Sequence, residues 1–190
     1  DCARRLEREA AESHAISIAH FFCELAERAL TQGDLDAAQA QVDEALTAHR
    51  KSVRATVLAG EIAARRKDHE RAVTLWLNVL DTDATYLPLV AARLTAAMDA
   101  LGRRQDALNL LRKNLQDAPS IDLLDVAFGR VSEWEGTAAA ETLLRQELKR
   151  NPSLLGFERL LALRMSNTAD DTELAQLRTL LATHTGRLAR

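Results

Sequence analysis

Residues 31–46 read TQGDLDAAQAQVDEAL, a turn followed by an amphipathic helix, and this arrangement returns three times along the chain. The other copies begin at residues 65, 100 and 134 and read RRKDHERAVTLWLNVL, ALGRRQDALNLLRKNL and WEGTAAAETLLRQEL. Each copy places a small residue after its turn and an apolar residue four positions later. The small residues are Ala38, Ala72, Ala107 and Ala140, and the apolar ones are Val42, Trp76, Leu111 and Leu144.

The four alanines are separated by 34, 35 and 33 residues. Upstream of each turn lies another helical pattern, such as SIAHFFCELAERAL at 17–30, whose apolar residues recur at steps of three and four. Pro119 and Pro152 each follow a second helix, which proline cannot continue. A period near 34 built from helix, turn and helix is the tetratricopeptide pattern. We therefore predict an all-α tetratricopeptide-repeat solenoid, a right-handed superhelix of antiparallel helix pairs.

Close packing of the two helices in a pair explains why alanine recurs at these positions. Two helices of a pair approach closely only where one of them presents a methyl group instead of a long side chain. We expect Ala26 and Gly60 to occupy matching positions of close approach in the first helices.

The predicted domain is a single array over residues 1–190, with repeats at about 19–52, 53–87, 88–120 and 121–153. Residues 1–15 are predicted to be a remnant second helix of an earlier repeat, and 154–190 a terminal helix pair. Asp170 or Asp171 is expected to cap the last helix. Because the chain begins without Met inside a helical pattern, we expect a fragment of a longer protein.

Composition narrows the functional classes. Aromatic residues make up only 4% of the chain, so Ala and Leu must build the core. The formal net charge is −3 without a basic stripe, which argues against a nucleic-acid partner. No apolar run reaches the roughly 18–20 residues that cross a bilayer, and the N-terminus lacks a signal-peptide core. Two cysteines form no disulfide framework, which is compatible with a reducing compartment.

His20 and Cys23 lie three residues apart, on one helical face, and could in principle share a metal or form a nucleophile and base. No further Cys or His pair lies nearby, so we expect a packing or groove-lining role and no catalytic residue, metal or cofactor. Carboxylate pairs such as Asp122 with Asp125 lack a calcium-loop pattern and are expected on solvated helix faces. Trp76 is expected in the core, and Trp134 either in the packing or half exposed.

Successive first helices of such arrays line a concave groove that binds partners. Chaperone adaptors that grip a terminal carboxylate carry Lys and Asn there, but Val57 and Glu61 stand in the comparable stretch, which does not support that clamp. The predicted groove residues are His20, Cys23, Glu27, Arg54, Val57, Glu61, Arg65, Leu89, Ala92, Asp122 and Asp125.

Three stretches resemble the lipopolysaccharide assembly protein B family. HFFCELAERALTQGDLDAAQAQVDEAL at 20–46 is similar to that family's "IAHFYCELA" helix and the repeat it opens. VRATVLAGEIAARRKDHERAV at 53–73 and RQELKRNPSLLGFERLL at 145–161 follow further segments of the family. The resemblance covers residues 16–182, and the helix containing HFFCELA is its most specific element.

The resemblance implies a non-enzymatic adaptor on the cytoplasmic face of the bacterial inner membrane, held by an N-terminal helix. Such proteins restrain lipopolysaccharide synthesis by helping a membrane protease degrade the lipid A deacetylase. They end in a rubredoxin-like metal domain held by two CxxC pairs. This chain contains neither the anchor nor those pairs, and Cys2 and Cys23 do not correspond to the metal ligands, so we expect a soluble fragment without metal.

Two alternatives stay open at this point. The chain could be a tetratricopeptide module of another envelope-assembly or secretion complex, or an enzyme that uses Cys23 and His20. A homo-oligomer is compatible with each of these functions.

Replacing Ala72 or Ala107 by Leu should overpack a helix pair and destabilise the chain by about 1–3 kcal/mol. The midpoint of denaturant unfolding measures this change. An unchanged midpoint would show that the register of the repeats is wrong.

Overall fold

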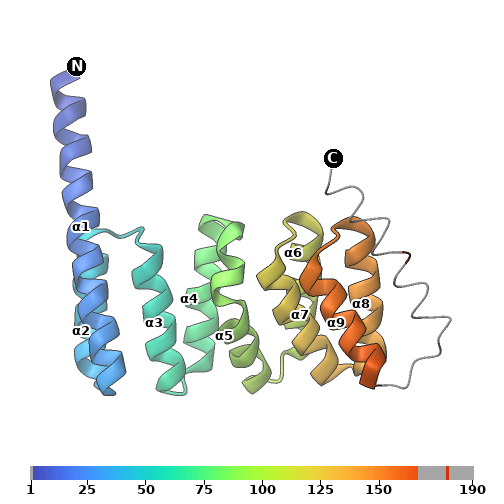
Figure 1. Cartoon of the computed structure of the whole chain (residues 1–190). Helices are drawn as coiled ribbons and strands as arrows, with labels where there is room; N and C mark the ends of the chain where they lie inside the picture. Colours follow the sequence, from blue (N-terminus) through green and yellow to red (C-terminus); the bar gives the residue numbers. More distant parts are fainter. Residues whose placement is uncertain (1, 167–178, 180–190) are drawn as a thin grey trace. The chain divides into compact units, whose positions relative to one another are not determined.

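The computed structural model describes residues 2–166 and 179. Regular structure in this part of the chain is entirely helical, which confirms the all-α class. The helices, shown in Figure 1, are α1 (Cys2–Gln32), α2 (Leu35–Ala48), α3 (Val53–Arg65), α4 (His69–Thr82), η1 (Ala84–Tyr86), α5 (Leu87–Ala100), α6 (Arg104–Asp117), α7 (Ile121–Trp134), α8 (Thr137–Arg150) and α9 (Leu154–Ser166).

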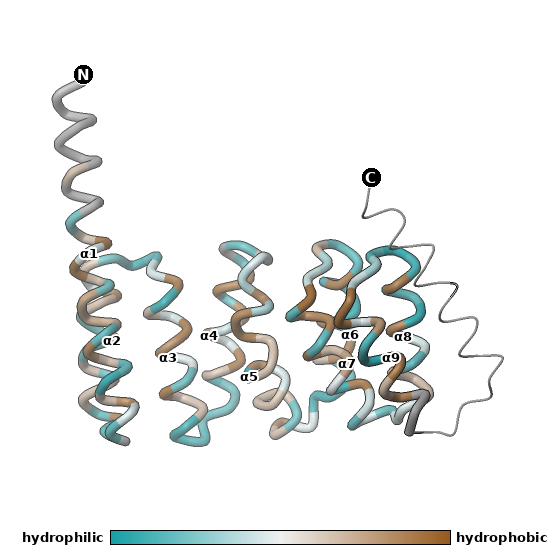
Figure 2. Tube along the Cα trace, viewed as in Figure 1, coloured by the Kyte–Doolittle hydropathy of each residue, from teal (hydrophilic) through white to brown (hydrophobic). Residues whose placement is uncertain are grey.

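The chain forms two compact units, Asp1–Ala107 and Leu108–Arg190. In the first unit α1 packs against α2 and α3, and α4 packs against α3 and α5. In the second unit α8 packs against α7 and α9, and α7 also contacts α9. Hydrophobic and hydrophilic residues alternate along these helices (Figure 2), as expected when one face of each helix packs against its neighbours.

Three of the turns inside repeats have the same backbone geometry. Their central residues are Gly33, Lys67 and Gly102, with φ of 80°, 65° and 71°. The residue after each donates its backbone N–H to the carbonyl five positions back, at 2.8–3.0 Å. This is the Schellman motif, whose central residue must adopt the left-handed conformation. The fourth turn differs, because its positive φ of 95° lies one position later, at Gly136.

Short polar side chains begin several of the helices. The carboxylate of Asp34 accepts from the backbone N–H of Ala37 at 2.9 Å, and Asp68 does the same for Arg71 at 3.2 Å. Ser52 and Ser120 cap α3 and α7 in the same way. Each cap satisfies a backbone donor that has no partner inside its helix.

The repeat positions predicted to be small or apolar are all buried. Ala38, Ala72, Ala107 and Ala140 are fully buried, and Val42, Trp76, Leu111 and Leu144 are at most 1% exposed. These burial values confirm the predicted core positions, including that of Trp76.

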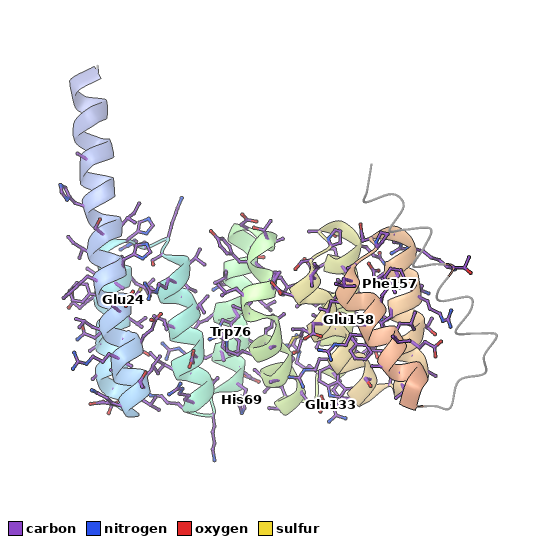
Figure 3. All side chains as sticks on the ribbon, viewed as in Figure 1. Glu24, His69, Trp76, Glu133, Phe157 and Glu158 are labelled. Carbon is purple, nitrogen blue, oxygen red and sulfur yellow. The ribbon has the colours of Figure 1, made fainter. Side chains whose placement is uncertain are left out.

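Trp76 explains why residue 60 is a glycine. Its indole Nε1 donates to the backbone carbonyl of Val57 at 3.2 Å, and the side chain lies inside the first unit (Figure 3). A Cβ atom added at Gly60 would lie 2.7 Å from Trp76 Cε2, closer than two carbon atoms can approach. Gly60 is therefore a position of close approach, as predicted, and Ala26 in α1 is likewise fully buried.

The predicted helix end near residue 15 is wrong. α1 is one continuous helix of 31 residues, whose first half projects past the end of α2 (Figure 1). The stretch contains neither Gly nor Pro, so nothing in the sequence interrupts the hydrogen bonds of the helix.

At the other end of the chain, α9 is the predicted first helix of the terminal pair. The second helix of that pair, with Asp170 and Asp171, lies outside the described residues. Among the helices that are described, none has the length and hydropathy needed to cross a bilayer.

Replacing Lys67 by Gly should stabilise the first unit by about 0.5–1 kcal/mol. An L-residue in the left-handed conformation costs about 1–2 kcal/mol, which exceeds the entropic cost of ordering a glycine. The midpoint of chemical denaturation measures the gain. The matched control is Lys113→Gly, an exposed site inside α6, which should lose about 1 kcal/mol. Equal destabilisation by both substitutions would contradict the role assigned to the turn.

Candidate binding groove

A groove with a volume of about 760 Å³ runs across the first helices of the first unit. Residues of α1, α3, α5 and the turn between α2 and α3 line it. Seven of the predicted groove residues meet there: His20, Glu27, Arg54, Val57, Glu61, Arg65 and Leu89.

Arg54 connects α3 to α1. Its Nε and Nη2 donate to the two carboxylate oxygens of Glu27 at 3.0 and 2.8 Å, and Nη2 also lies 2.7 Å from Glu24 Oε1. These hydrogen bonds, with Glu27 contributing most, raise the pKa of Arg54 above its usual value. The guanidinium is therefore always charged, and its planar shape fixes the position of Glu27.

Glu61 connects α3 to α5. Its two carboxylate oxygens each lie 2.7 Å from an arginine, Oε1 from Arg65 on its own helix and Oε2 from Arg93 on α5. Arg65 in turn donates to the backbone carbonyl of Leu30 in α1 at 2.7 Å. As a result, both carboxylates that line the groove are neutralised by arginines.

The rest of the lining is apolar or able to donate hydrogen bonds. Leu89, Tyr86 and Ile16 are 53%, 38% and 36% exposed, so the groove presents apolar side chains to solvent. Lys51 is exposed, and within the described residues it has no carboxylate partner. Four Lys and Arg side chains line the groove against two carboxylates, so the groove carries excess positive charge.

Sequence reasoning missed the other lining residues, among them Ile16, His49, Lys51, Tyr86 and Arg93. Arg93 could have been found, because it follows Leu89 by four residues and so shares its helical face. Lys51 and His49 lie in the turn before α3, and Tyr86 lies in η1. Because these residues lie outside the predicted helices, helical periodicity does not predict which way their side chains point.

Cys23 does not line the groove as the sequence suggested. Its side chain is fully buried in the core formed by α1, α2 and α3, and this burial raises the pKa of the thiol, while Arg54 and Ser52 act in the opposite direction. His20, by contrast, is exposed on the groove. The two residues therefore differ in accessibility. Across the described residues no group of three or more His, Cys, Asp or Glu side chains could hold a metal ion.

Asp122 and Asp125 lie on α7, in the second unit. Asp122 is exposed, whereas Asp125 pairs with Arg159 of α9 at 2.8 Å. The Arg159 guanidinium also lies 6.0 Å from the ring centroid of Phe128, within the range of a cation–π contact. Trp134 is half-buried, with the guanidinium of Arg130 5.4 Å from its ring centroid.

The tetratricopeptide-repeat family description matches residues 23–88. Two solved structures share the arrangement of helices. The pilF protein of Pseudomonas aeruginosa superimposes with a TM-score of 0.59 over 88% of this chain and 75% of its own, at 14% identity. A thermophilic tetratricopeptide-repeat protein of Thermus thermophilus does so with a TM-score of 0.55 over 86% of this chain and 90% of its own, at 19% identity. The chain has the tetratricopeptide-repeat fold.

Among curated proteins, lipopolysaccharide assembly protein B of Escherichia coli K12 is 23% identical over 161 residues. The match includes 85% of this chain and 41% of the relative, so the chain spans about two fifths of that protein's length. It is consistent with the resemblance seen in the sequence, at the level of a distant relative.

Cys23 should react slowly with iodoacetamide at neutral pH in the folded chain. The reactive species is the thiolate, and both the burial and the raised pKa of Cys23 suppress it. Peptide mass spectrometry of the alkylated chain measures the rate, and the same chain in denaturant is the control. A folded rate equal to or above the denatured rate would favour a reactive cysteine.

Proposed function

We propose that the chain is a protein-binding adaptor module that holds a segment of its partner in the groove of the first unit. The observation that carries the proposal is the combination of exposed apolar side chains with excess positive charge in one groove. A partner that covers Leu89, Tyr86 and Ile16 removes their apolar area from water, which favours binding.

The charged residues of the groove indicate which charge the partner segment carries. Glu27 and Glu61 are occupied by arginines of the chain itself, so neither is available to a basic partner. Lys51 is available, and His20 and His49 add ring nitrogens at the groove. A partner segment with carboxylates and aliphatic side chains fits this lining best.

We further infer that the adaptor acts in the control of lipopolysaccharide biosynthesis. The support is the 23% identity with lipopolysaccharide assembly protein B along 85% of the chain. The partners are then a membrane protease and the lipid A deacetylase, met at the cytoplasmic face of the inner membrane. Holding two proteins together raises their effective concentration without chemistry in the repeats, so this function needs no cofactor in the chain.

A binding experiment with charge and size variants tests the proposal. The purified chain is immobilised and presented with the deacetylase, and separately with the protease, from the same organism. We expect retention of at least one of them, and a loss of about tenfold in affinity with Lys51→Glu or Leu89→Ala.

The matched controls are Lys113→Glu and Leu161→Ala, because both residues are exposed and lie in the second unit. They should bind as the unsubstituted chain does. Retention that the groove variants leave unchanged would remove the groove from the function. Failure to retain either protein would favour a module of another envelope-assembly or secretion complex.

A further inference from the structure

Glu147 of α8 is a buried carboxylate. Its residue is 5% exposed, and it is the one charged residue among the buried side chains of the described part of the chain. Its ion pair there is with Arg150, whose Nη1 lies 3.5 Å from Glu147 Oε1. This separation is too long for a good hydrogen bond, so Arg150 holds the carboxylate only loosely.

The repeats themselves show that the fold does not need a charge at this position. Glu147 comes seven residues after the small alanine of its repeat, and the equivalent residues in α2, α4 and α6 are Ala45, Val79 and Asn114. Ala45 and Val79 are 0% and 3% exposed. Where the other repeats place a methyl or an isopropyl group, or a neutral amide, this one buries a carboxylate, which is costly unless something pairs with it.

Two surface clefts share Glu147. The larger, of about 330 Å³, is polar and includes both Arg112 and Arg150. The smaller, of about 150 Å³, lies between the inter-repeat turns at 118–120 and 151–153. Its apolar lining residues are Leu115, Pro119, Ile121, Leu124 and Pro152, and Glu147 is the one charged residue that lines it.

Among the described residues, no Lys or Arg side chain lines the smaller cleft, so a cationic ligand could pair with Glu147 there. Arg112 of α6 forms an ion pair with Glu135, and it lines the larger cleft. Arg150 is about half exposed, so it keeps its hydration if it moves away from the carboxylate. From α7, the residues of the smaller cleft are the apolar Ile121 and Leu124, and the turns add only Ser, Asn and Pro.

We propose that the smaller cleft accepts a lysine side chain of a partner protein, whose ammonium group pairs with Glu147. The narrow apolar walls suit the four-carbon stem of lysine, which packs along apolar surface while its charged end reaches a polar group. A carboxylate ligand would be repelled by the like charge of Glu147.

A protein is favoured over a free amine by the rim of the cleft. Ile121 at the cleft and Leu154 directly after the second turn are 55% and 72% exposed. A protein segment carrying the lysine would cover these side chains, which a small amine cannot do. This surface belongs to the second unit, and the inference does not depend on the groove of the first.

The test uses a matched pair of probes, Nα-acetyl-lysine N-methylamide and Nα-acetyl-norleucine N-methylamide, which have the same stem and differ in the ammonium group. The carboxyl carbon of Glu147 is followed by NMR during a pH titration of the whole chain. Burial raises the pKa of Glu147 in the free protein. The lysine probe should lower this pKa by about half a unit or more, because a bound cation favours the carboxylate. The norleucine probe should not lower it.

Substitutions separate binding from folding. Glu147→Gln should abolish the perturbation of the cleft signals by the lysine probe, whereas Glu141→Gln, on the same helix and paired with Arg145, should leave it unchanged. Glu147→Val should keep the helical circular dichroism, since Val79 fills the equivalent site. Because the folded pKa is raised, Glu147 weakens stability as pH rises above 4.5 towards that folded pKa, and the Val variant should lose this dependence.

Three results would overturn the inference. The first is an equal response to the two probes. The second is a response of exposed Glu158 to the lysine probe as large as that of Glu147, which would mean nonspecific ion pairing. The third is tighter binding of spermidine than of the lysine probe to the same cleft, which would assign the site to a free polyamine.

Discussion

The close approach of two helices at a residue without a large side chain sets the geometry of each repeat. At Gly60 the indole of Trp76 occupies the space where a Cβ would lie, and its Nε1 bonds to the backbone of the same helix at Val57. The fully buried alanines at 38, 72, 107 and 140 allow the same close approach in the second helices, because a methyl group takes up little space. Once the pair spacing is fixed in this way, short turns suffice to connect the helices, and the first helices within a unit come into contact with each other.

Arginines then connect one first helix to the one before it. Arg54 of α3 reaches Glu27 of α1, Arg93 of α5 reaches Glu61 of α3, and Arg159 of α9 reaches Asp125 of α7. This use fits the composition, with twenty-one Arg against four Lys, because a planar guanidinium holds a carboxylate in a defined orientation and an ammonium does not. Such exposed pairs add little to the free energy of unfolding. In the first unit, the effect of these pairs is to fix which charges the groove offers to a partner.

The repeat fold could be predicted because its signals are local and recur. The alanine spacing, the turns and the prolines appear in the order of the chain, and helical periodicity then places residues such as Arg54 and Glu61 on one face. Other features depend on neighbours that the sequence does not name. Whether Cys23 meets solvent or the core depends on how closely α3 covers α1. The lining role of Lys51 depends on the path of a turn, and the burial of Glu147 could not be distinguished from an exposed helix face, where carboxylates usually lie.

The chain has two tryptophans, and the structure assigns one to each compact unit. Trp76 is sealed in the first unit with its indole nitrogen bonded to a carbonyl, whereas Trp134 in the second is half-buried beneath a guanidinium. Their emission spectra should therefore differ in wavelength, and each should respond to the loosening of its own unit. Repeat arrays unfold through nearest-neighbour coupling between their elements, which single-probe measurements average away. This protein carries a pair of built-in fluorophores that can resolve how strongly its two halves cooperate.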